Sequence, residues 1–173
     1  MRQIHKALQQ CFDNPTRESV AKAFLYLFKN QVLTTVTFAT AAATNFTSTG
    51  QFTVLVDGVT VQPTAANANF TLPAGFVVPN SGTPWGVCGL ACDKFGNLYY
   101  FPGQATWSNI GSIIYPTPPD TRDGTVVLCY FILNNGSAGT FTGGTTNTNT
   151  AGLVWTYALE YDGIYQINNF GQV

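Results

Sequence analysis

The sequence predicts a mainly β protein, an antiparallel β-sandwich, jelly-roll-like domain or barrel, with a short helical segment at its N-terminus. Three observations predict this class. Apolar residues follow a helical period as far as Asn30, and beyond it the chain is rich in Ala, Thr, Val, Asn and Gly. Two Asp-Gly turn dipeptides, Asp57-Gly58 and Asp162-Gly163, each separate two β-like runs. Turn residues divide the rest into roughly eight expected strands.

Residues 1–30 are expected to form the helical segment, and residues 31–173 the β-domain. Apolar side chains recur at helical spacing in two stretches, and Asn14-Pro15 between them is a good helix start. The second stretch has a wide apolar face, which needs a neighbour: the β-domain, another copy of the chain, or a different protein. The candidate interface residues are Ile4, Leu8, Phe12, Phe24, Leu27 and Phe28.

The first strand is expected over Val32–Phe38, which is rich in β-branched residues, and residues 39–45 are expected to form a loop or a weak edge. The clearest local signal follows at Asp57-Gly58, a dipeptide typical of a type I′ turn. A two-residue hairpin places Val56 opposite Val59 and Val54 opposite Val61. Together with Phe52, these side chains are expected to share one face.

The middle of the chain alternates between β-like runs and turn clusters. Phe70 and Leu72 predict a short strand, and Leu98–Phe101 predicts another after a turn at Asp93–Asn97. Residues 102–124 are loop-rich, with a possible short strand at Ile110–Tyr115. The continuous apolar run Thr125–Leu133 predicts a strand that is buried on both faces.

The last part begins with a Thr-, Gly- and Asn-rich stretch, Asn134–Gly152, which predicts an exposed loop of low complexity. Leu153–Tyr161 and Ile164–Ile167 then flank the second Asp-Gly turn and predict a second hairpin. Its first strand is expected to carry Trp155, Tyr157, Leu159 and Tyr161 on one face.

Charged residues make up only 9% of the chain, against about 25% in ordinary soluble domains, so the polar surface is mostly neutral. Such a surface favours contact with other proteins. Five basic and two acidic residues give residues 1–30 a net charge of +3, and two basic and six acidic residues give the rest −4. The basic excess is too small to predict nucleic-acid binding. Residues 1–29 contain no uninterrupted apolar core of a signal peptide, and no stretch of the sequence has the roughly 18 consecutive apolar residues of a membrane span, so no membrane partner is expected.

Catalytic chemistry is not expected, and the chain is predicted not to be an enzyme. The one histidine, His5, has no helical-spacing acid beside it, and most carboxylates lie in turn clusters where Asp binds its own backbone. Glu160 is the carboxylate that lacks such a turn. Cys88 and Cys92 form a C-x3-C pair without the further ligands of a zinc site, so no metal or cofactor is expected, and a late disulfide between them is the alternative.

The order of motifs in the first half of the β-domain resembles a known class of proteins. Gly50-Gln-Phe-Thr-Val-Leu-Val-Asp-Gly-Val-Thr-Val61 is followed by Leu72-Pro-Ala-Gly75, Trp85-Gly-Val-Cys88 and Asp93-Lys-Phe-Gly-Asn-Leu98. Together with the helical N-terminus, this texture resembles small structural proteins of tailed bacteriophages, in particular head decoration (cement) proteins and related fibre modules.

The resemblance implies a virion structural protein, located in the virion and made in the host cytoplasm. It implies a homotrimer that binds the major capsid protein or other virion proteins and stabilises the assembled head. The alternative is a fibre, spike or receptor-binding module that contacts host glycans, for which Trp107 is a candidate among the many aromatic residues.

Overall fold

The computed structural model describes residues 20, 30–34, 36–103, 105–116, 125–136, 139–161 and 164–169, and their side chains as far as residue 158. Of the expected helical segment, Val20 is helical and Asn30 lies in a bend, and residues 1–19 and 21–29 lie outside the described residues. The described part is mainly β, as predicted, and all of its strand pairs are antiparallel.

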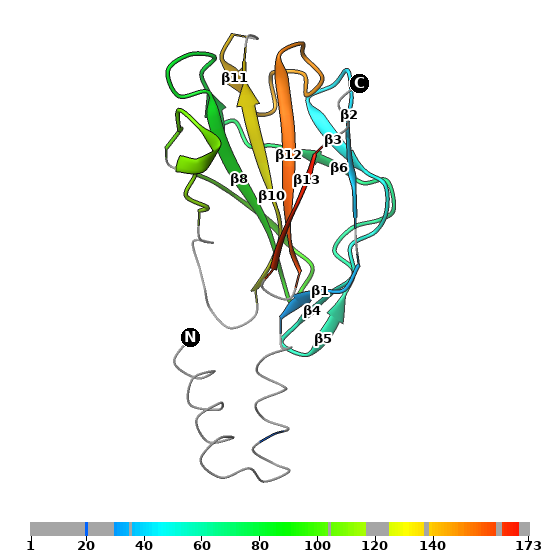
Figure 1. Ribbon diagram of the computed structural model, residues 1–173. Helices are drawn as coiled ribbons and strands as arrows, with labels where there is room; N and C mark the ends of the chain where they lie inside the picture. Colours follow the sequence, from blue (N-terminus) through cyan, green and yellow to red (C-terminus); the bar gives the residue numbers. More distant parts are fainter. Residues whose placement is uncertain are drawn as a thin grey trace.

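The larger layer is a five-stranded sheet with the order β13-β12-β10-β8-β9. Long strands that run along the molecule form its centre (Figure 1). The bounds are β8 (Trp85–Asp93), β9 (Leu98–Pro102), β10 (Thr125–Asn135), β12 (Leu153–Tyr161) and β13 (Ile164–Asn169). Its edge strands β9 and β13 do not pair with each other, so the sheet does not close and the barrel alternative is wrong.

The second layer is divided into short sheets. One has the order β2-β3-β6, the second β1-β4-β5, and the third pairs β7 with β11. Figure 1 shows β2, β3 and β6 beside the main sheet and β1, β4 and β5 at one end of it. The bounds are β1 (Gln31–Val32), β2 (Phe38–Thr40), β3 (Asn45–Ser48), β4 (Val54–Val56), β5 (Val59–Val61), β6 (Asn69–Thr71), β7 (Val77–Val78) and β11 (Phe141–Thr142).

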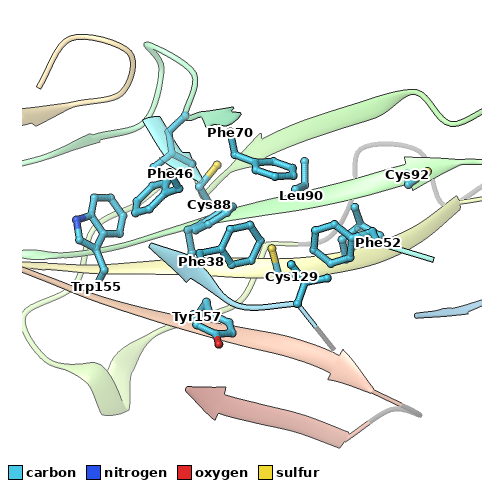
Figure 2. Close-up of a cluster of buried hydrophobic side chains, with 14 of the residues drawn as sticks. Phe38, Phe46, Phe52, Phe70, Cys88, Leu90, Cys92, Cys129, Trp155 and Tyr157 are labelled. Atoms are coloured by element: carbon cyan, nitrogen blue, oxygen red, sulfur yellow. The ribbon is translucent and has the colours of Figure 1, made fainter. Parts of the chain in front are cut away.

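Aromatic side chains fill the space between the two layers. The ring of Phe38 lies within 5 to 6 Å of the rings of Phe52, Phe70, Phe131 and Tyr157, mostly edge to face. Figure 2 shows this cluster with the buried thiols of the main sheet beside it. Edge-to-face pairs add to the energy of burial, so the aromatic content serves mainly to hold the sandwich together.

The opposite face of the main sheet is covered as well. A second buried cluster there includes Val87, Phe101, Tyr130 and Ile132, and residues 105–116 pack over it. The expectation that β10 is buried on both faces is confirmed, because Phe131 belongs to the first cluster and its neighbours Tyr130 and Ile132 to the second.

The strand expected at Ile110–Tyr115 in this cover is wrong: Ile110–Ser112 is a short 3-10 helix. The backbone N–H of Ser112 donates to Asn109 O (3.2 Å), and the Ser112 hydroxyl donates to Asn109 Oδ1 (2.9 Å). These local bonds offer the backbone an alternative to strand pairing.

A β-bulge in β10 decides which residues face which layer. Val127 pairs with Ala91 and Cys129 pairs with Leu90, so Leu128 is an extra residue that has no pairing partner in β8. Leu128 and Cys129 consequently both lie in the core between the layers.

The Asp57-Gly58 hairpin is confirmed in type and register. Val54 pairs with Val61 and Val56 with Val59, and Asp57 and Gly58 both have positive φ (52° and 77°), as a type I′ turn requires. The shared apolar face is only partly correct. Val54 and Val56 are fully buried, whereas Val59, in the outer strand β5 of this small sheet, is 55% exposed.

The single strand expected at Val32–Phe38 is wrong. Val32 ends β1 and Phe38 begins β2, and the two strands belong to different sheets. Between them, the Thr34 hydroxyl donates to Gln51 O (3.1 Å) and accepts from the Thr53 N–H (2.8 Å). The Thr34 side chain thus replaces the backbone hydrogen bonds that would continue β1. Residues 39 and 40 continue β2, which is an edge strand. For these two residues the weak edge is therefore the correct one of the two structures expected over residues 39–45.

The second hairpin is confirmed in register, because Tyr161 pairs with Ile164 across a two-residue connection. Trp155 and Tyr157 share the core face as expected, and the side chains of Leu159 and Tyr161 lie outside the described ones.

The loop expected to be exposed at Asn134–Gly152 is instead partly buried. It contains β11, and Thr148 within it is only 1% exposed. The Thr148 hydroxyl accepts from the Ala41 N–H (3.1 Å) and lies within hydrogen-bonding distance of three carbonyl oxygens, and Trp155 Nε1 donates to Thr148 O (2.9 Å). Gly143 lies so close to Pro73 that an added Cβ would be 2.2 Å from its carbonyl oxygen. The loop is therefore part of the folded core.

Candidate interaction surface

Most residues singled out from the sequence as functional candidates lie outside the described part of the chain. This holds for the predicted interface residues Ile4, Leu8, Phe12, Phe24, Leu27 and Phe28, and for His5. Glu160 lies in β12 opposite Tyr165 of β13, and its side chain is not among the described ones.

The described thiols are core residues. Cys88, Cys92 and Cys129 are free and buried. Burial raises the pKa of the Cys88 thiol to about 12, and burial together with the charge of Asp93 raises that of Cys92 to about 11. Cys88 and Cys92 lie four positions apart in one extended strand, about 13 Å at ~3.3 Å per residue. A disulfide needs Cα atoms within about 7 Å, so the alternative of a Cys88–Cys92 bridge is wrong.

No group of three or more His, Cys, Asp or Glu side chains within the described ranges is arranged to hold a metal ion. In the same part of the chain, no helix is long and apolar enough to cross a membrane.

The turn between β8 and β9 is held together by one carboxylate. Oδ1 of Asp93 accepts from the backbone N–H of Phe95 (2.8 Å) and of Asn97 (2.9 Å). Oδ2 accepts from the Asn97 side-chain amide (2.8 Å) and the Tyr99 hydroxyl (2.8 Å). Gly96 has a φ of +86°, the left-handed conformation that closes a three-residue hairpin loop.

These contacts determine the ionisation of Asp93. Partial removal from water raises its pKa, but the hydrogen bonds from Asn97, Tyr99 and Phe95 outweigh that effect and lower the pKa to about 2. The carboxylate is therefore ionised at neutral pH and is fully used by its own turn. It serves the turn structurally and does not have the raised pKa typical of a general acid.

The same turn presents an exposed aromatic side chain. Phe95 is 78% exposed, more than any other large apolar residue described. The Lys94 ammonium lies 5.2 Å from the centre of its ring, and Tyr99 beside the turn is also exposed. We call Asp93–Tyr99 the hairpin tip. It joins a large apolar ring, a cation and a fixed backbone in one small surface.

A second surface with exposed apolar residues lies on the cover of the main sheet. Trp107 pairs with Trp85 through two backbone hydrogen bonds (3.0 and 2.9 Å), and both side chains are half-buried. Further along the cover, Ile110 is 51% and Ile114 is 73% exposed. We call these four residues the cover surface.

The hairpin tip was not identified from the sequence as a functional feature, although the turn itself was expected. The signal was present: in Asp93-Lys-Phe-Gly-Asn97 a phenylalanine occupies a loop position between two strands, where small polar residues are usual. A large apolar side chain in a three-residue loop lies too far from the core to be buried there, so Phe95 stays exposed.

Comparison of the chain with protein-family models, with curated proteins and with solved structures finds no match in any of the three.

Proposed function

We propose that this chain is a virion structural protein, a capsid decoration protein that binds the assembled head and stabilises it, with the major capsid protein as its partner. The observation that carries the proposal is the scarcity of charge on the sandwich. Among the described side chains only Asp57, Asp93 and Lys94 are charged. Free soluble domains carry about a quarter of their residues as charges, and the centres of protein interfaces are depleted in them.

The use of these three charges supports binding over catalysis. Asp57 occupies a hairpin turn, Asp93 binds its own turn, and Lys94 lies over an aromatic ring of the same tip. Asp93 accepts four hydrogen bonds within its own turn and has a lowered pKa, so its carboxylate serves the turn and is not suited to act as a general acid.

The two-layer architecture also fits an assembly role. Both faces of the main sheet are covered by the chain itself, so partners meet loops, hairpin tips and strand edges of a rigid body. A rigid body loses little conformational freedom when neighbours cover it, which favours association.

Sedimentation with empty shells tests the proposal. The shells are assembled from the major capsid protein that the proposal expects to be encoded near the gene of this chain, and the control is the same capsid protein as free subunits. The purified chain is expected to sediment with shells and not with free subunits, and to have a solution mass of three 18.6-kDa monomers. Absence of shell binding, or of capsid and tail genes nearby, would refute the decoration role.

A fibre or receptor-binding role is the second candidate, and the half-buried Trp85–Trp107 pair favours it, because the part of each tryptophan side chain that stays accessible can contact a sugar. Titration with host glycans should then change the tryptophan fluorescence, and Trp107→Ala should remove the change. A chain that binds glycans but not shells would replace the decoration proposal with this one.

A further inference from the structure

We propose that the hairpin tip is the anchor with which the chain docks on its protein partner. Phe95 fills an apolar pocket on the assembled shell, and Lys94 pairs with a carboxylate at the rim of that pocket. This inference rests on the proposed function and names the surface that performs it.

The first argument is the unused apolar surface of Phe95. Its ring is 78% exposed, whereas Phe38, Phe52 and Phe70 are buried, so most of its gain from leaving water is still available to a partner. Single aromatic side chains that enter a pocket dominate the energy of many interfaces.

The second argument is that the tip is fixed before binding. The Asp93 carboxylate holds the backbone N–H groups of Phe95 and Asn97, and the Tyr99 hydroxyl closes the other side. Ordering a loop during association costs free energy, and this tip already has its shape. Asp93 is thus a positioning residue for Phe95.

The third argument concerns the chemistry of the partner. Lys94 is the one basic side chain among those described, and its ammonium lies at the ring that would be buried. A partner therefore needs acidic groups around its pocket. A second copy of the chain carries such groups too, so the oligomeric state in the assay below distinguishes a second copy from the shell. One cation is also too little for a nucleic acid.

Four single variants and the wild-type chain test the inference in the same sedimentation assay. Phe95→Ser removes the ring, and Phe95→Trp retains an aromatic anchor. Lys94→Gln removes the charge. Val59→Thr is the matched control, because Val59 is an exposed apolar residue next to the other described hairpin turn. All four variants change exposed side chains, so circular dichroism melts should match the wild type.

Phe95→Ser is expected to weaken shell binding about 30-fold or more, the loss typical of a central aromatic anchor. Phe95→Trp and Val59→Thr should stay within about threefold of the wild type. Wild-type binding should weaken with added salt, and Lys94→Gln should reduce that dependence, because charges at the edge of an interface act through long-range attraction.

The outcomes separate the two proposals. Wild-type binding with unchanged binding by Phe95→Ser overturns the anchor and leaves the decoration role intact. No binding by the wild-type chain overturns both. If Phe95→Ser retains shell binding but converts an oligomer into a monomer, the tip docks on a second copy, and the proposed partner is wrong.

Discussion

Replacement of the buried Thr148 hydroxyl tests whether the loop over residues 139–150 belongs to the core. Thr148→Val keeps the shape of the side chain and removes the hydroxyl. The Ala41 N–H then loses its acceptor at 3.1 Å, and one of three nearby carbonyl oxygens loses a donor. A buried polar group without a partner costs about 1–3 kcal/mol, so we expect a loss of about 2 kcal/mol in the free energy of unfolding.

Thr148→Ser is the matched control. It keeps the hydroxyl and removes one buried methyl group, which is worth about 0.8 kcal/mol. The order of stability should therefore be wild type, Thr148→Ser, then Thr148→Val. For a chain of this length, 2 kcal/mol corresponds to about 4–8 °C in the melting temperature.

Urea unfolding followed by far-ultraviolet circular dichroism measures these differences, and equal denaturant slopes would show that the unfolded states are comparable. The reasoning is refuted if Thr148→Val is as stable as Thr148→Ser, because the hydroxyl would then contribute nothing that its methyl replacement lacks.

Two further predictions concern Gly89 and Asp93. An added Cβ at Gly89 would lie 2.1 Å from Cζ of the buried Phe101 ring, so Gly89→Ala should lower the free energy of unfolding by about 1–3 kcal/mol. Gly50→Ala is the control, because an added Cβ there would meet nothing within 4 Å and should change the free energy of unfolding by less than about 0.5 kcal/mol. Equal melting temperatures of the two variants would contradict the close packing at Gly89. The folded pKa of Asp93, about 2, lies below its ordinary 3.8, so its ionisation stabilises the fold above pH 3.8 and this contribution is lost as the pH falls toward 2. Solvent screening keeps it below about 1 kcal/mol, and urea unfolding between pH 5 and pH 2 should show a smaller acid loss for Asp93→Asn; parallel curves would count against the tip network.

Local signals in the sequence were enough to predict the hairpins. The Asp57-Gly58 turn and the register around it depend on residues that are neighbours in the chain, where turn chemistry and alternation agree. The buried strand β10 was equally recognisable, because an uninterrupted apolar run bounded by turn residues is typical of a strand covered on both faces.

Features that depend on distant partners were not predictable in this way. The bond between Ala41 and Thr148 joins residues 107 positions apart, so nothing near Thr148 indicates that its loop is buried. The break between Val32 and Phe38 arises from Thr34 bonding to residues of another segment. The tip was missed for a different reason: Phe95 resembles the other aromatic residues of this chain, and most of those whose side chains the structure describes fill the two buried clusters.

The extra residue in β10 has a consequence for how this chain can change over time. Because Leu128 stands opposite no residue of β8, its deletion would restore a regular strand and leave every other pair between β10 and β8 in register. Val126 would stay in the core between the layers, and Val127 would stay on the opposite face. A deletion of one residue at Leu128 should therefore leave the pairing of this strand intact, so related chains can differ in length by one residue at this position.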